Sequence, residues 1–287
     1  MLKHRLFYGT LMAVFFTVIV IFDGWLDGSL TASVVDNRTV QGTILCILIA
    51  GLIIPAQLEL SRLAKAKNLK IFTPVSIIAS ILFASTWYWQ QLIEIQPLIY
   101  LFFLSASSLW ALLLYQYFRY GTSEVIANCG ANYFSIIYVG LFCGFVLGIR
   151  IEFGLWPLLM FVFVIKSADI GAYTAGTLFG KHKFSPKISP GKTWEGMAGA
   201  VATAVIVGLL FAAGCDIMAW WAAVIFGICF AFIGQAGDLV ESMMKRDAEQ
   251  KDSSNKVPGF GGILDIIDSP LFAAPFAYLF FMFSVTG

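Results

Sequence analysis

The chain has 287 residues, of which 59% are hydrophobic and only 12% are charged, with a formal net charge of +1. This composition excludes an ordinary soluble domain, and repeated apolar runs of about 20 residues indicate transmembrane helices. Five cysteines are scattered through apolar segments without CxxC spacing, so we expect small hydrophobes in helices and no disulfide or metal site. The net charge says little, because the distribution of charge matters more than its total; we expect no nucleic-acid partner.

The apolar runs predict an all-α polytopic membrane protein with about nine transmembrane helices. The first run follows a basic start and lacks a small-residue cleavage site, so we interpret it as a retained helix and not as a signal peptide. The predicted spans are 6–22, 40–60, 71–90, 97–115, 133–149, 155–176, 197–214, 217–237 and 263–284.

Lysines and arginines predict the orientation, because short cytoplasmic loops collect them. With a cytoplasmic N-terminus, 15 of the 18 lysines and arginines fall in inside segments. Arg38 and Arg150 are the two left outside, and Lys166 lies within a span. The asymmetry favours nine spans with the N-terminus inside.

We divide the chain into N-terminal membrane helices, 1–130, and a C-terminal catalytic membrane domain, 131–287, with cytoplasmic loops at 177–196 and 240–262. The N-terminal part looks chemically quiet. Its basic run 61–70 is interpreted as a topology signal, with contact to anionic lipid as the alternative. The acidic residues near the predicted span ends are expected to face water or headgroups; these are Asp23, Asp27, Glu59, Glu94, Glu124 and Glu152.

The first chemical signal is in the sixth span. Lys166, Asp169 and Tyr173 lie three and four residues apart, so they share one helix face. The pair of opposite charges can simply neutralise itself, and that alternative stays open. Small residues nearby permit a close helix neighbour; they are Gly171, Ala172, Ala175 and Gly176.

The following loop, KHKFSPKISPGKTWEG, concentrates lysines with Ser189 and Thr193. This chemistry suits a polyphosphate, and we expect Lys192 to contact one. SPGKT resembles a fragment of a phosphate-binding P-loop, but the first glycine and the preceding strand are absent. A Walker-type nucleotide fold is therefore not predicted.

Two carboxylate pairs flank the last loop. Asp238, Glu241, Ser242 and Lys245 fall at i, i+3, i+4 and i+7, which places them on one stripe of a helix. Asp265 and Asp268 form a second pair at the start of the last span. Hard oxygen ligands of this kind suit Mg²⁺ together with substrate phosphates.

The alternative is that these acids are neutralised by salt bridges to Lys245, Arg246 or Lys251. The turn at 257–262, VPGFGG, has glycines that would let backbone N–H groups approach an anion.

These loops and their helices resemble the phosphatidate cytidylyltransferases, also called CDP-diacylglycerol synthases. The resemblance covers roughly the last 120 residues well and rests on two long motifs in the right order. The first motif reads Asp169, Ala172, Tyr173, Ser189, Pro190, Gly191, Lys192, Thr193, Glu195 and Gly196. The second reads Ser242, Lys245, Arg246, Lys251, Asp252, Pro258, Gly259, Gly261, Gly262, Leu264, Asp265, Asp268 and Ser269. Phe260 and Ile266 replace a histidine and an arginine of the family pattern, which affects the expected rate and substrate preference.

The resemblance implies transfer of the cytidylyl group from CTP to phosphatidic acid, giving CDP-diacylglycerol and pyrophosphate, in a multi-pass protein of the inner membrane whose active site faces the cytoplasm. A homodimer is also implied as possible. We assign Asp238, Asp265 and Asp268 to Mg²⁺ and, with Lys245, to catalysis. The expected substrate-binding residues are Asp169, Ser189, Lys192, Glu241, Ser242, Arg246, Lys251 and Asp252.

Three other interpretations remain. One is a related lipid-phosphate nucleotidyltransferase or kinase, and another is a degenerate paralogue, motivated by Phe260 and Ile266. The third is an ion-coupled transporter or channel using Lys166, Asp169 and the acids as a relay. The hydropathy shows no obvious inverted repeat, and the polar residues gather at one face of the membrane instead of its midplane, which disfavours the third.

Overall fold

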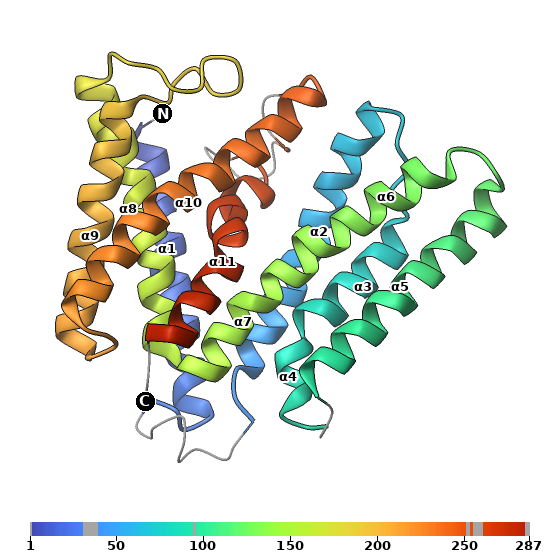
Figure 1. Cartoon of the computed structure of the whole chain (residues 1–287), viewed down its shortest axis with the longest axis horizontal. Helices are drawn as coiled ribbons and strands as arrows, with labels where there is room; N and C mark the ends of the chain where they lie inside the picture. Colours follow the sequence, from blue (N-terminus) through green and yellow to red (C-terminus); the bar gives the residue numbers. More distant parts are fainter. Residues whose placement is uncertain (1, 31–39, 94–95, 251–252, 255–260, 285–287) are drawn as a thin grey trace.

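A bundle of helices makes up the described part of the chain, which in this computed structural model comprises residues 2–30, 40–93, 96–250, 253–254 and 261–284 (Figure 1). No strand occurs among these residues. The helices are α1 Leu2–Leu26, α2 Thr43–Ala66, α3 Thr73–Ala84, α4 Thr86–Gln90, α5 Pro97–Tyr120, α6 Val125–Ser135, the π-helix η1 Ile136–Leu141, α7 Phe142–Phe153, α8 Leu155–Phe179, α9 Trp194–Cys215, α10 Trp220–Asp247 and α11 Leu264–Ser284.

The all-α membrane architecture predicted from hydropathy is confirmed. Eight helical segments of the described chain are long and apolar enough to cross a membrane, with α6, η1 and α7 forming one continuous segment, Val125–Phe153. The predicted span 71–90 forms the shorter helices α3 and α4 instead of one long helix. Ser85 and Thr86 at the break donate side-chain hydrogen bonds to the carbonyls of Ile81 and Phe83, a pattern that bends helices.

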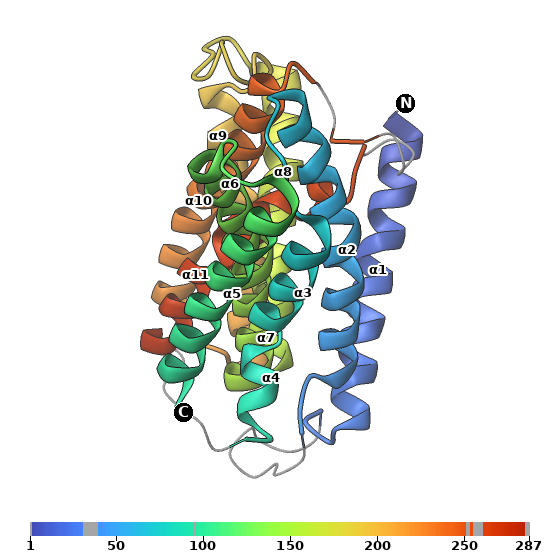
Figure 2. The same ribbon diagram turned by 90° about the vertical axis from the view of Figure 1, so that its right-hand side faces the viewer.

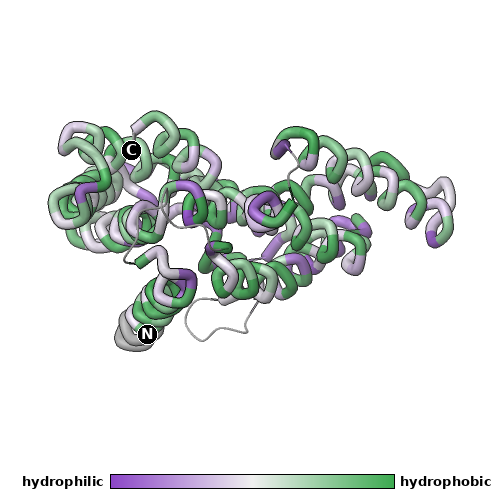
Figure 3. Tube along the Cα trace, turned by 90° about the horizontal axis from the view of Figure 1, so that it is seen from below, coloured by the Kyte–Doolittle hydropathy of each residue, from purple (hydrophilic) through white to green (hydrophobic). Residues whose placement is uncertain are grey.

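Most helix surfaces of the bundle are apolar. Hydrophobic positions run along the helices when the molecule is seen from below (Figure 3). Phe102 and Phe118 on α5 are 76% and 79% exposed, as expected for side chains that face lipid tails.

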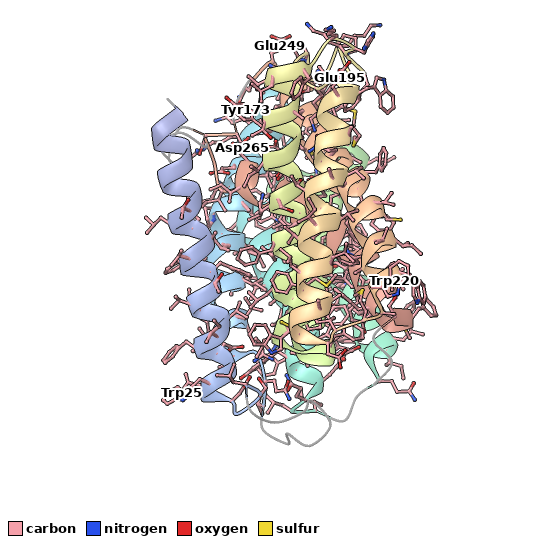
Figure 4. All side chains as sticks on the ribbon, turned by 90° about the vertical axis from the view of Figure 1, so that its left-hand side faces the viewer. Trp25, Tyr173, Glu195, Trp220, Glu249 and Asp265 are labelled. Atoms are coloured by element: carbon pink, nitrogen blue, oxygen red, sulfur yellow. The ribbon has the colours of Figure 1, made fainter. Side chains whose placement is uncertain are left out.

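The charged loops lie at one end of the bundle. α1 begins at the end where α8 leads into α9 and where α10 finishes (Figures 1 and 2). Figure 4 shows Glu195, Glu249 and Asp265 toward this end, and Trp25 and Trp220 toward the other. We call it the loop end. The loop between α8 and α9 and the end of α10 lie at the same end of the bundle, as the predicted alternation of spans requires.

Glycines let α8 and α9 pack closely, as the small residues of the sixth span predicted. A Cβ on Gly171 would lie 2.2 Å from the Oγ1 of Thr203 and 2.4 Å from the carbonyl oxygen of Gly199. A Cβ on Gly199 would in turn lie 2.4 Å from the Cβ of Ala175. The two backbones therefore touch, which is how membrane helices associate through small residues.

The expectation that Asp23 and Asp27 are solvated is wrong. Both are buried at the opposite end from the loop end, where Arg150 of α7 is 0% exposed. The Nε of Arg150 lies 3.1 Å from Asp23, and its Nη2 lies 2.9 Å from Asp27. Asp23 also accepts the backbone N–H of Ile44 at the start of α2, where a helix favours negative charge. This ion cluster joins α1, α2 and α7, since each charge is acceptable in the interior only with its partners.

Candidate active site

The polar stripe of α10 is confirmed. The helix continues past the apolar span to Asp247, so that Asp238, Glu241, Ser242 and Lys245 follow one another along a single face. Ser242 donates a hydrogen bond of 3.4 Å to Asp238. The helical period alone brings these side chains together.

Three carboxylates meet where α10 faces α11. Oxygen atoms of Asp238, Glu241 and Asp268 lie within 4.8 Å of one another. The helices can approach this closely because residue 237 is glycine: a Cβ there would lie 2.8 Å from the Cβ of Phe272 and 3.1 Å from the carbonyl oxygen of Asp268. We call Asp238, Glu241 and Asp268 the acid cluster.

The acid cluster fits a hard divalent cation. Glu241 is 0% exposed and Asp268 is 5% exposed. Within the described residues, the Oε1 atom of Glu241 has no hydrogen-bond partner. A buried carboxylate oxygen without a partner is costly, and an all-oxygen donor set is what Mg²⁺ prefers.

Two lysines bracket the acid cluster. Lys192, from the loop before α9, lies with its Nζ 2.6 Å from Asp238. Lys245 contacts Glu241 and lies 2.5 Å from the Oδ1 of Asp265. Of the salt bridges that the sequence offered as an alternative, those of Lys245 with Glu241 and Asp265 form.

Asp265 lies beside the acid cluster, shares Lys245 with Glu241 and has further neighbours in the last loop. Its Oδ2 accepts the Oγ–H of Ser253 at 2.7 Å and the backbone N–H of Gly262 at 2.7 Å. Its Oδ1 faces Lys245. Of the predicted metal set, the structure thus brings Asp238 and Asp268 together with Glu241, while Asp265 contacts Lys245 and the last loop. That Asp265 is a direct metal ligand stays a prediction.

Asp169 of α8 joins the site through a chain of polar contacts. Its Oδ1 accepts a hydrogen bond of 3.2 Å from Gln235, whose own Oε1 accepts one of 2.9 Å from Lys192. Its Oδ2 lies 3.4 Å from Lys166, and Lys166 also donates to the carbonyl of Ile266 on α11 at 2.9 Å. The Lys166–Asp169 pair forms, and it links α8 to both α10 and α11.

The remaining predicted substrate-binding residues lie around the loop between α8 and α9. The backbone of Ser189 accepts the N–H of Lys192 at 3.2 Å, which turns the chain toward the site. Arg246 is exposed and donates to the carbonyl of Ile188 at 3.3 Å, which ties the end of α10 to this loop. Lys251 and Asp252 lie outside the described residues, as does Phe260.

Thr193 and Glu195 of the first motif shape the loop. The hydroxyl of Thr193 caps α9 by accepting the N–H of Gly196 at 3.1 Å. Glu195 accepts the backbone N–H groups of Lys181 and His182 at 3.1 and 3.2 Å. Both contacts fix the loop that carries Lys192.

Glu59 of α2 is a buried residue next to the site that the sequence did not predict. It was expected to face water or headgroups, and this is wrong: it is 1% exposed and lies against the last loop and the start of α11. Its carboxylate accepts the backbone N–H groups of Ile263 and Leu264 at 3.2 and 2.9 Å. The signal that could have found it is general, since an ionisable residue in a membrane helix is a functional candidate by default.

Tyr138 is a second residue that the sequence analysis missed. It lies on η1, a π-helical turn of the kind that often occurs at functional sites. The side chain is 3% exposed, and its hydroxyl has no hydrogen-bond partner among the described residues. A buried tyrosine hydroxyl usually finds a partner, which was the available signal.

Comparison with known sequences identifies the family. The chain belongs to the cytidylyltransferase family, whose model matches residues 3–284. It is 42% identical over 135 residues to a phosphatidate cytidylyltransferase of Haemophilus influenzae, covering 44% of this chain and 46% of that protein. Its identity to the Bacillus subtilis enzyme of the same name is 40% over 145 residues, covering 50% of this chain and 54% of the relative. For the Mycobacterium bovis enzyme of that name it is 38% over 159 residues, covering 54% and 51%. The chain thus matches these relatives over about half of their length.

Proposed function

We propose that this chain transfers the cytidylyl group of CTP to phosphatidic acid, producing CDP-diacylglycerol and pyrophosphate. The observation that carries the proposal is the acid cluster, bracketed by Lys192 and Lys245 at the loop end of a membrane bundle. Membership of the cytidylyltransferase family and the names of the relatives agree with it.

The reaction needs charge neutralisation more than it needs a base. An oxygen of the lipid phosphate attacks the α-phosphorus of CTP, and the bond from that phosphorus to the bridging oxygen of the β-phosphate breaks. The electron pair leaves with pyrophosphate. The attacking oxygen is already anionic, so no side chain has to remove a proton from it. Positioning and electrostatic stabilisation then supply most of the catalysis.

The acid cluster would hold Mg²⁺, with Asp265 as a further candidate ligand. When bound, Mg²⁺ supplies positive charge that stabilises the negative phosphate oxygens. Asp238 and Asp268 supply negative charge from facing helices, and Glu241 adds a buried carboxylate between them and Lys245.

The basic residues would hold the phosphates. Lys192 and Lys245 are placed to bind phosphate oxygens next to the acid cluster, and Asp169 organises Lys192 through Gln235. Ser242 orients Asp238. Contacts to the outer phosphates and to CTP are assigned to Ser189, Arg246, Lys251 and Asp252.

The loop end would face the cytoplasm, with the protein in the inner membrane. CTP is water-soluble and would enter from that side, whereas phosphatidic acid would enter sideways from the bilayer. The positive-inside rule supports this orientation, because the loop end carries most of the lysines and arginines. Homodimer formation stays a prediction, which light scattering of the detergent-solubilised protein can test.

The direct test is incubation of purified protein with radiolabelled CTP, phosphatidic acid and Mg²⁺. We expect a labelled lipid that co-migrates with CDP-diacylglycerol, and release of pyrophosphate. The product should disappear when EDTA is added or when diacylglycerol replaces phosphatidic acid, because diacylglycerol lacks the attacking phosphate. If labelled lipid forms only from a different lipid phosphate, that lipid phosphate replaces phosphatidic acid as the proposed substrate. If no lipid phosphate yields a labelled lipid, the proposal is overturned.

A further inference from the structure

The carboxylate of Glu59 is surrounded by donors from a part of the chain about 200 residues away. One oxygen, Oε1, accepts the Oγ–H of Ser254 at 2.9 Å and the N–H of Ile263 at 3.2 Å. The other, Oε2, lies 3.1 Å from the Oγ of Ser253 and accepts the N–H of Leu264 at 2.9 Å. We call this arrangement the Glu59 clamp.

The Glu59 clamp occupies the start of α11. The N–H groups of Ile263 and Leu264 lie at the N-terminus of that helix, which begins at Leu264 and where the helix dipole favours a negative charge. Backbone N–H groups can only donate, so a carboxylate is the suitable partner for both. Gly262 adds a steric requirement, because a Cβ there would lie 2.0 Å from the Oγ of Ser253 and 2.3 Å from the Oε2 of Glu59.

Among the described residues of the last loop, the backbone N–H groups expected to bind an anion are therefore already hydrogen-bonded. The N–H of Gly262 binds Asp265, and the next two N–H groups bind Glu59. These groups hold the protein's own carboxylates in place of a substrate phosphate. Their role is to fix the loop.

The clamp is linked to the acid cluster through Asp265 and Lys245. Ser253 contacts Glu59 and also donates its N–H to Asp265 at 3.1 Å. Asp265 in turn pairs with Lys245, which contacts Glu241. Glu59 is thus linked to Asp265 through Ser253, and to Lys245 through Asp265, although no described contact joins Glu59 directly to Asp265, Lys245 or Glu241.

We propose that Glu59 is a positioning residue for the cytidylyl transfer: an N-terminal helix holds the last loop so that Asp265 keeps Lys245 directed at the acid cluster. This inference rests on the proposed function for its kinetic part. It assigns a role in the catalytic arrangement to α2, one of the N-terminal membrane helices that the sequence indicated to be chemically quiet.

The test compares wild type with Glu59→Gln, which keeps the shape but replaces one acceptor oxygen with an NH₂ group that faces other donors. We expect kcat to fall by about ten- to a hundredfold, the usual effect of losing hydrogen bonds to a buried charged group. The KM for CTP should change less than threefold, because Glu59 does not touch the nucleotide in this proposal. Hydrogen–deuterium exchange should speed up in peptides containing Ile263 and Leu264 and stay unchanged in α9.

Two further variants make the result interpretable. Glu152→Gln is the matched control: Glu152 also lies on a membrane helix and accepts hydrogen bonds from Trp87 and Tyr278, but at the other end of the bundle. It should leave kcat within about twofold of wild type. Ser253→Ala is the second test variant if Glu59→Gln does not fold, and it should lower kcat in the same way. Where both fold, the double variant should lose less activity than the product of the two single losses, since both act through one contact.

The outcomes separate the two proposals. An active wild type whose Glu59→Gln and Ser253→Ala variants keep kcat within twofold would overturn the positioning role. Unchanged exchange at Ile263 and Leu264 would overturn the clamp itself, and this measurement does not require any catalytic activity. A wild type that is inactive with CTP and every lipid phosphate would instead count against the proposed function, and the exchange result would still decide whether Glu59 holds the loop.

Discussion

Lys192 and Asp238 form an ion pair of 2.6 Å between the α8–α9 loop and α10, two segments that are separated by a full membrane span in the sequence. The lysine side chain is 11% exposed and also donates to the carbonyl of Gln235. This contact fixes a positive charge beside one member of the acid cluster. It brings the two family motifs into one site.

Substitution of Lys192 by alanine should lower kcat/KM for CTP by at least about tenfold, because a shielded lysine that binds phosphate contributes far more than a surface lysine. Steady-state kinetics over a range of CTP concentrations measures the effect. Lys187→Ala is the matched control, since Lys187 is an exposed lysine of the same loop. Equal effects of the two substitutions would show that the loop contributes only general positive charge.

Substitution of Asp268 by asparagine should lower turnover more than about tenfold, a loss above roughly 1.4 kcal/mol, since the amide keeps the shape but removes charge that holds Mg²⁺. The affinity for Mn²⁺, measured by electron paramagnetic resonance without substrate, should fall in parallel. Asp247→Asn is the control on α10, because Asp247 is exposed and pairs with Lys67 at 3.1 Å. Asp268→Asn protein with normal Mn²⁺ binding would refute the assignment of Asp268 to the metal.

Replacement of Arg150 by methionine should destabilise the protein by about 3–5 kcal/mol, because it removes the positive charge that pairs with Asp23 and Asp27 in the interior. Reversible unfolding in mixed detergent micelles measures this free energy. Arg119→Met is the control, since Arg119 lies exposed in the last turn of α5. Adding Asp23→Asn and Asp27→Asn to the Arg150 variant should recover part of the loss. A stability equal to that of the control would show that the ion cluster is not needed for the fold.

Cysteine labelling should place the loop end in the cytoplasm. In a variant without the five native cysteines, Lys187→Cys should resist a membrane-impermeant maleimide in intact cells, and Leu92→Cys at the opposite end should react. Both should react once the membrane is permeabilised. The reverse pattern in intact cells would invert the orientation and the proposed route of CTP.

The sequence by itself determined the features that depend on one segment at a time. Apolar runs determined the membrane helices because a span must bury its whole length in lipid, and only the span at 71–90 divided into two shorter helices. The helical period placed Asp238, Glu241 and Lys245 on one face before any fold was known. The small residues around Gly171 likewise predicted a close helix neighbour, which in the structure is α9.

Only the tertiary structure decided which helices bring their polar residues together. Glu59, Asp23 and Asp27 lie near span ends, and the sequence at such positions is equally compatible with water and with a buried partner. Packing gave Glu59 three donors, from Ser254, Ile263 and Leu264, together with a contact to the hydroxyl oxygen of Ser253, and it gave the two aspartates Arg150. The same packing added Asp268 of α11 to Asp238 and Glu241 and directed Asp265 to Lys245. The physical reason is that a helical repeat orders side chains within its own helix, whereas the desolvation of a charge depends on which other helix lies against it.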